Sequence, residues 1–111
     1  MLFLPNNVKT NLFNMLFAEK IKQLRDERSM PQRQIAAALE IDTATYCKIE
    51  KGDRRAKREQ VFLLSKIFKY ESDDLLKIWL ADQVYEMIKN EKEAKEVLNL
   101  VQESIVEYEK G

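Results

Sequence analysis

Apolar side chains recur every three or four positions along most of the chain, which is the spacing of an amphipathic helix. Phe17, Ile21 and Leu24 follow this spacing and predict a first helix from residue 15 to about residue 28. The pattern also predicts helices at about 32–39, 43–51 and 58–69, and one from residue 72 through Trp79.

Local signals mark the ends of these helices. Pro31 stands at or before the first turn of a helix, where its missing N–H costs little. Asp42 is placed to cap the free amides of the helix that follows it. Gly52 is expected to end that helix, because glycine takes the left-handed conformation at low cost. The helix around residues 32–39 and the helix at 43–51 are therefore joined by a tight connection at Glu40 and Ile41.

Composition supports an all-α fold and excludes several functions. The 111 residues include only 2 Gly and 2 Pro, too few for the turns of a β-sandwich or barrel. The chain has no His and a single Cys, Cys47. Zinc sites, Ser–His or Cys–His nucleophiles and internal disulfides are thereby excluded. No glycine-rich phosphate loop occurs either, so we expect no enzyme, no metal, no cofactor and no small-molecule ligand.

The formal net charge is zero, but the charge is unevenly distributed. Residues 1–72 carry 14 basic and 9 acidic residues, whereas residues 73–111 carry 5 basic and 10 acidic residues. Six bases are concentrated in residues 48–58. A basic half suggests polyanion binding, although such a run is also typical of a solvated face.

No apolar run approaches the roughly 20 residues that a transmembrane helix needs. The apolar residues 1–4 are followed at once by Pro5, and no basic region precedes them as in a secretory signal. We therefore expect a cytoplasmic protein without membrane contact. Residues 1–14 are assigned to an N-terminal arm without a function.

Two short helices joined by a tight turn form a helix-turn-helix unit. Residues 21–76 resemble the lambda-repressor-like (Cro/CI, XRE) family of DNA-binding domains. The resemblance rests on Gln32, Ile35-Ala36 and Leu39, followed by Ile49-Glu50-Lys51-Gly52 and Asp73-Asp74-Leu75-Leu76. The sequence departs from the family pattern at two positions. Glu40 replaces the usual turn glycine, and Pro31 replaces the usual serine cap.

The resemblance implies a five-helix DNA-binding domain whose third helix enters the major groove. Thr43, Ala44, Cys47 and Lys48 share one face of that helix and match the positions that contact bases. Lys48 could donate to guanine, Thr43 could bond or contact a thymine methyl, and Ala44 offers apolar contact. Thr43 and Ala44 could equally be ordinary first-turn residues, and Cys47 a small filler.

A second set of residues matches positions that contact phosphates. The family's position at the start of the second helix bonds phosphate through an amide, assisted by the helix N-terminus. The basic loop after the third helix follows the sugar–phosphate edge in the family. The candidate phosphate contacts are Gln32, Thr45, Lys51, Arg54, Arg55, Lys57 and Arg58.

Arg25 and Glu50 match an ion pair that joins the first and third helices in the family. Such a pair, if buried, would fix the angle of the third helix through bidentate geometry. Its expected role is architectural, and Glu50 bears the wrong charge to bind phosphate.

The C-terminal third carries a heptad-like apolar seam that begins at Leu80 and ends at Tyr108, with Glu91 as its polar member. Residues 90–93 read as a capping box, so we expect two helices in a hairpin rather than one rod. The seam could pack on its own domain and cover Trp79. We favour a dimer interface that includes Leu98, Val101, Ile105 and Tyr108.

These observations predict an N-terminal arm (1–14), a helix-turn-helix DNA-binding domain (15–78) and a C-terminal helical dimerisation region (79–111). The expected function is that of a homodimeric transcriptional regulator that binds double-stranded DNA at a two-fold operator. Small proteins of this family include phage repressors, restriction–modification controllers and antitoxins, and the sequence does not distinguish among them. The alternative is an antitoxin-type interaction module whose C-terminal helices bind a partner protein.

Overall fold

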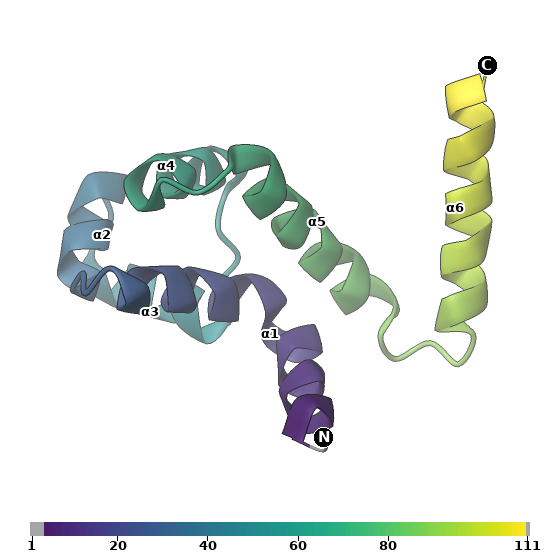
Figure 1. Cartoon of the computed structure of the whole chain (residues 1–111), viewed down its shortest axis with the longest axis horizontal. Coiled ribbons are helices and arrows are strands. Elements are labelled where there is room, and N and C mark those ends of the chain that lie inside the picture. Colours follow the sequence, from purple (N-terminus) through teal and green to yellow (C-terminus); the bar gives the residue numbers. More distant parts are fainter. Residues whose placement is uncertain (1–3, 111) are drawn as a thin grey trace.

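The structure is a computed structural model that describes the backbone of residues 4–110 and the side chains of residues 16–110. Within this range the chain forms helices only, which confirms the all-α prediction (Figure 1). The helices are α1 (Leu4–Glu27), α2 (Gln32–Leu39), α3 (Thr43–Lys51), α4 (Arg58–Phe68), α5 (Ser72–Ile88) and α6 (Ala94–Lys110).

The helix boundaries match the sequence pattern closely between residues 31 and 72. Two helices are longer than expected: α1 begins at Leu4 instead of residue 15, and α5 continues past Trp79 to Ile88. The side chains of residues 4–15 lie outside the description, so the assignment of residues 1–14 to an arm stays a prediction.

The core lies between α1 and the four helices that follow it. Helix α5 packs against α1 and α4, and α3 packs against α1 and α2. The periodic apolar positions of each helix point into this core, because burial of one face is what stabilises short helices. The largest fully buried side chains are Tyr46, Phe68, Ile21, Ile35, Ile49, Leu64, Leu75 and Val61.

The connection between α2 and α3 has the geometry that the sequence implied. Glu40 ends α2 in the left-handed conformation, with φ 60° and ψ 41°. Asp42 caps α3, and its Oδ1 accepts a hydrogen bond from the Thr45 amide at 2.7 Å. Gly52 ends α3 with φ 84°, as expected. Pro31 precedes α2 and provides no side-chain cap.

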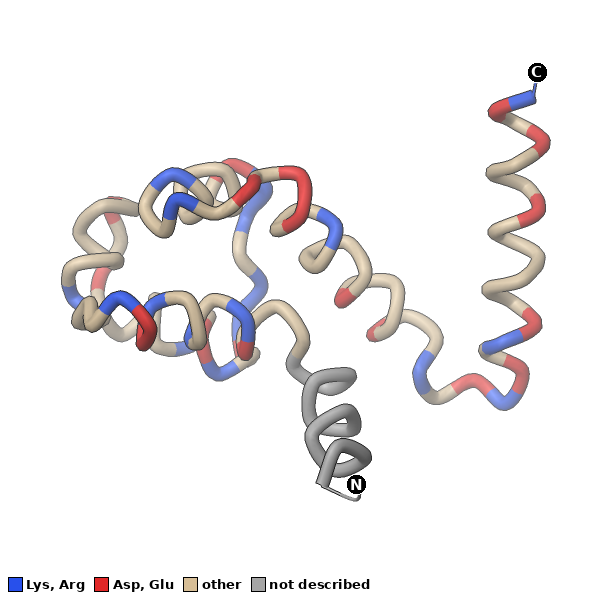
Figure 2. The backbone as a smooth tube through the Cα atoms, viewed as in Figure 1, with Lys and Arg blue, Asp and Glu red and all other residues tan. Residues whose placement is uncertain are grey.

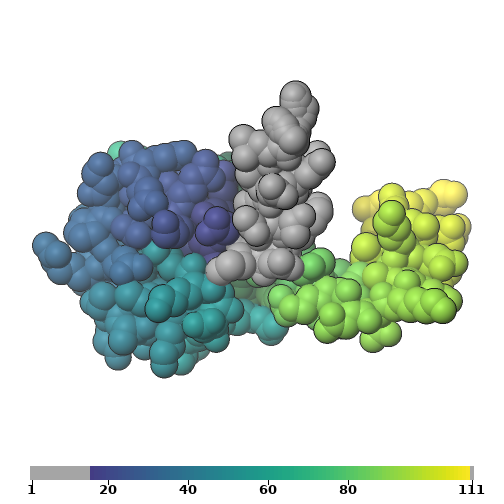
Figure 3. Space-filling model, turned by 90° about the horizontal axis from the view of Figure 1, so that it is seen from below, coloured from purple at the N-terminus to yellow at the C-terminus, as the bar shows by residue number. Residues whose placement is uncertain are grey.

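The predicted break in the C-terminal region is confirmed, because α5 ends at Ile88 and α6 begins at Ala94. The two helices diverge from the connecting turn and do not pack against each other as a closed hairpin (Figure 1). No residue of α6 is buried. Figure 3 shows α6 as a separate mass at one end of the molecule. The alternative in which α6 packs on its own domain and covers Trp79 is therefore wrong for this structure.

Candidate nucleic-acid interface

Helix α3 presents two distinct faces. Tyr46 and Ile49 are buried against the core, whereas Thr43, Ala44 and Lys48 are exposed. Burial raises the pKa of the Tyr46 hydroxyl, and the nearby negative charge of Glu50 raises it further. Tyr46 therefore stays neutral in the core. The opposite face of α3, with Thr43, Ala44 and Lys48, is exposed to solvent.

Arg25 of α1 and Glu50 of α3 form the ion pair that the family resemblance implied. The Arg25 Nε and Glu50 Oε2 atoms are in contact, and the Arg25 Nη2 donates to Glu50 Oε1 at 3.1 Å. The side chains are 14% and 2% exposed, respectively. The hydrogen bond to Glu50 raises the pKa of the Arg25 guanidinium. Arg25 also donates through Nη1 to the Met30 carbonyl at 2.8 Å, so it links α1, the α1–α2 turn and α3.

Gln32 at the start of α2 belongs to the same hydrogen-bond network. Its Nε2 donates to Glu50 Oε1 at 3.0 Å, and its Oε1 accepts from the Cys47 thiol at 3.0 Å. Both side chains are partly buried. From the sequence, Gln32 and Cys47 were predicted to contact DNA separately. In the structure their side chains contact each other between α2 and α3.

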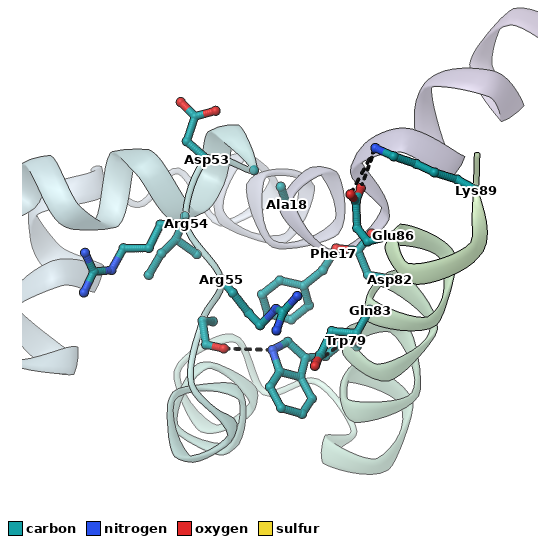
Figure 4. Close-up of a pocket in the computed structure, with 13 residues that line it drawn as sticks. Phe17, Ala18, Asp53, Arg54, Arg55, Trp79, Asp82, Gln83, Glu86 and Lys89 are labelled. Atoms are coloured by element: carbon teal, nitrogen blue, oxygen red, sulfur yellow. Dashed lines mark hydrogen bonds and ion pairs between the residues drawn. The ribbon is translucent and has the colours of Figure 1, made fainter. Parts of the chain in front are cut away.

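The basic segment between α3 and α4 lies on the surface, and Figure 2 shows basic positions along most of it. Lys51, Arg54 and Lys57 are exposed. Figure 4 shows that the side chain of Arg54 points away from the cleft beside α5, whereas that of Arg55 points into it. Arg58 lies over the Trp79 ring, with its guanidinium carbon 5.9 Å from the ring centre.

The cleft beside this segment also contains Asp82 of α5 (Figure 4). Burial raises the pKa of the Asp82 carboxyl, Glu86 raises it further, and Arg55 opposes both effects. The Oδ1 atom of Asp82 is buried without a hydrogen-bond partner. Arg55 thus faces an acidic group of its own chain, while Arg54 faces outward.

Sequence reasoning missed two hydrogen bonds from side chains to backbone carbonyls, one of which anchors the basic segment. The Trp79 indole N–H donates to the Ala56 carbonyl at 2.9 Å. Arg28 donates through Nε to the Phe68 carbonyl at 2.8 Å, and so ties the end of α1 to the end of α4. Both hydrogen bonds are accepted by backbone carbonyls. Every residue has such a carbonyl, so the residue type gives no signal for these bonds. Arg33, the exposed neighbour of Gln32, was also not among the candidates, although its charge and position in the first turn of α2 could have suggested it.

Among the residues that the structure describes, no group of three His, Cys, Asp or Glu side chains could hold a metal ion. In the same part of the chain, no helix has the length and apolar character required to cross a bilayer.

An outward-facing α3, held on the core by a buried ion pair and preceded by α2 across a tight turn, defines a helix-turn-helix DNA-binding domain. A family model described as "Helix-turn-helix" matches residues 21–75. This segment is therefore a helix-turn-helix domain of the Cro/CI (XRE) type. Comparison with curated proteins and with solved structures gave no significant match.

Proposed function

We propose that this protein is a transcriptional regulator that binds double-stranded DNA sequence-specifically, as a homodimer on a two-fold operator. The observation that carries the proposal is the exposed face of α3 in a helix-turn-helix domain, held at a fixed angle by Arg25 and Glu50. Rigid placement matters because base contacts need side chains held within hydrogen-bond geometry of the base edges.

Base contacts are assigned to the outward face of α3. Thr43, Ala44 and Lys48 are exposed on this face, as readout of base edges requires. Cys47 lies on the same face but is held by Gln32, so its contribution is limited to apolar contact at the edge of the interface.

Phosphate contacts are assigned to both sides of α3. Lys51 ends α3, and Arg54 and Lys57 follow it. All three are exposed, which suits electrostatic contact with the DNA backbone. Thr45, in α3, and Gln32, at the start of α2, precede these residues in the chain and are partly buried. The Gln32 amide uses one N–H on Glu50 and retains a second for phosphate. Arg55 and Arg58 are also exposed, and their side chains would turn from Asp82 and Trp79, respectively, toward phosphate.

The homodimer is supported by the apolar residues of α6. Leu98, Val101, Ile105 and Tyr108, which we call the α6 stripe, are all exposed, with values from 42% for Leu98 to 86% for Tyr108. Soluble monomers seldom expose contiguous apolar patches of this kind. A dimer buries the stripe and supplies the two recognition helices that a two-fold operator needs.

Titration of two variants against operator and random DNA tests the DNA-binding assignment. The operator is first selected from random duplexes. Lys48→Ala should lose about 1–3 kcal/mol of specific binding and relax preference at one base pair. Arg54→Ala should weaken binding to all sequences and reduce the salt dependence by about one phosphate contact. Equal losses on operator and random DNA for both variants would refute the role of Lys48 in base readout.

Truncation after Lys89 tests the dimer. Because α6 contributes no buried residue, the shortened chain should fold. We expect it to be monomeric and to bind the operator several orders of magnitude more weakly through lost avidity. Sedimentation equilibrium at micromolar concentration provides the measurement. A truncated chain that still dimerises would refute the role of α6.

The second candidate is an antitoxin-type interaction module in which α6 binds another protein. The same exposed stripe favours it, because the patch fits any complementary helix. A full-length chain that stays monomeric at micromolar concentration would support this candidate over the homodimer.

A further inference from the structure

Helix α6 has a wide apolar face with a definite charge pattern at one edge. The stripe residues follow the a and d positions of a heptad, and a shallow apolar groove runs along them between Leu100 and Tyr108. On helical spacing, Lys95, Gln102 and Glu109 occupy the e positions along one edge of this face. The opposite edge, at the g positions, carries Val97 and Ser104, which are uncharged.

This edge pattern distinguishes two ways of pairing α6 with a second copy of itself. In a parallel pair, g residues of one helix face e residues of the other. Val97 and Ser104 would then face Gln102 and Glu109 of the second copy, and no opposite charges would meet. In an antiparallel pair, e residues face e residues. Lys95 and Glu109 lie at equal distances on either side of Gln102, so each Lys95 would face Glu109 of the second copy.

The apolar positions fit the same arrangement. An antiparallel register centred on position 103, next to Gln102, places Leu98 opposite Tyr108 of the second copy and Val101 opposite Ile105 of the second copy. Each of these layers joins an a position to a d position, as antiparallel helices require. The larger side chain of Tyr108 thus falls at both ends of the pair, where its hydroxyl can reach water.

We propose that α6 pairs with α6 of a second copy in antiparallel orientation, with Lys95 facing Glu109 of that copy at both ends and Gln102 near the two-fold axis. The proposal rests on the proposed homodimer and specifies its interface. The charged edge selects orientation, while burial of the α6 stripe provides the affinity. The orientation places the two helix-turn-helix domains at opposite ends of the helix pair.

Charge reversal gives the first test, with the dissociation constant of the full-length chain measured by sedimentation equilibrium. Lys95→Glu and Glu109→Lys each replace two attractive pairs by two repulsive ones, and each should weaken the dimer about tenfold. An equimolar mixture of the two variants should recover wild-type affinity, because in the heterodimer both pairs are again attractive. Glu103→Lys and Lys110→Glu, which lie on the outward face, serve as controls and should leave the affinity unchanged.

Disulfide formation gives an independent test in a Cys47→Ser background. Gln102→Cys should crosslink under mild oxidation, because the two introduced thiols approach each other only across an antiparallel pair. Glu103→Cys, one position further and pointing outward, should not. Dimers that resist charge reversal and fail to crosslink at residue 102 would overturn the antiparallel arrangement and leave the homodimer standing. A full-length chain that stays monomeric in all of these experiments would overturn both the antiparallel arrangement and the homodimer.

Discussion

The indole N–H of Trp79 donates a hydrogen bond to the carbonyl oxygen of Ala56 across 23 residues of chain. Ala56 lies in the middle of the basic segment between α3 and α4, and both residues are buried. This contact fixes the segment that follows α3 to α5. The surface proposed to face DNA is therefore anchored by α5, which lies outside the helix-turn-helix unit formed by α2 and α3.

Trp79→Phe should keep most of the apolar packing but leave the Ala56 carbonyl without its donor. A buried unsatisfied carbonyl costs about 1–3 kcal/mol. We expect that loss in the free energy of unfolding, measured by denaturant titration without DNA. A variant as stable as the wild type would mean that water replaces the indole at Ala56.

Glu50→Gln should destabilise the domain in the absence of DNA, because it leaves the Arg25 guanidinium without its counter-charge. Loss of one partner of a buried pair costs about 3–5 kcal/mol. The control is Glu27→Gln, which removes an exposed pair with Arg28 at 3.5 Å and should cost under about 1 kcal/mol. Thermal denaturation compares the two. Equal losses of stability in the two variants would show that the buried Arg25–Glu50 pair stabilises the domain no more than an exposed pair does.

Glu40→Gly should stabilise the turn between α2 and α3. Glu40 adopts a left-handed conformation with φ 60°, which costs a residue with a Cβ about 1 kcal/mol. Ala37→Gly, in the interior of α2, is the matched control and should be destabilising by a similar amount. If both changes lower the melting temperature, the backbone at Glu40 carries no strain that glycine can relieve.

The cap at Asp42 should make stability fall at acidic pH. Hydrogen bonds from Thr45 lower the pKa of the Asp42 carboxyl below its usual value of 3.8. The contribution of the ionised cap is therefore complete above that value and is lost as the pH falls through the lower, folded-state pKa. Asp42→Asn keeps an acceptor that does not titrate. The difference in melting temperature between the two proteins should change only in this acidic range.

The pH dependence of stability that Asp82 contributes should have the opposite sign to that of Asp42. Burial raises the pKa of its carboxyl, so the ionised form opposes folding once the pH exceeds the usual value. Asp82→Asn should raise the melting temperature at neutral pH, and the gain should vanish at pH values where the wild-type carboxyl is protonated. Glu103→Gln, exposed on α6, is the control and should give no such gain. A lower melting temperature for Asp82→Asn would show that the favourable charge interaction of Asp82 with Arg55 outweighs the cost of burial.

The sequence alone determined the helices between residues 31 and 72 and the face of α3 that is buried. These features depend on local periodicity, on the cap at Asp42 and on Gly52, all of which act within one or two turns. The Arg25–Glu50 pair was also expected, because its residues match a family pattern. The exposed positions of Thr43, Ala44 and Lys48 follow from the same helical geometry.

Only the tertiary structure decided where the remaining polar side chains go. Gln32 joins Glu50 and Cys47, Arg55 turns toward Asp82, and Trp79 reaches Ala56. These partners are distant in sequence, and their meeting depends on how helices pack rather than on any local pattern. The heptad spacing of the C-terminal third likewise did not predict that α6 would lie apart from its own domain. An amphipathic stripe indicates that a helix needs a partner surface, but it does not indicate which surface that is.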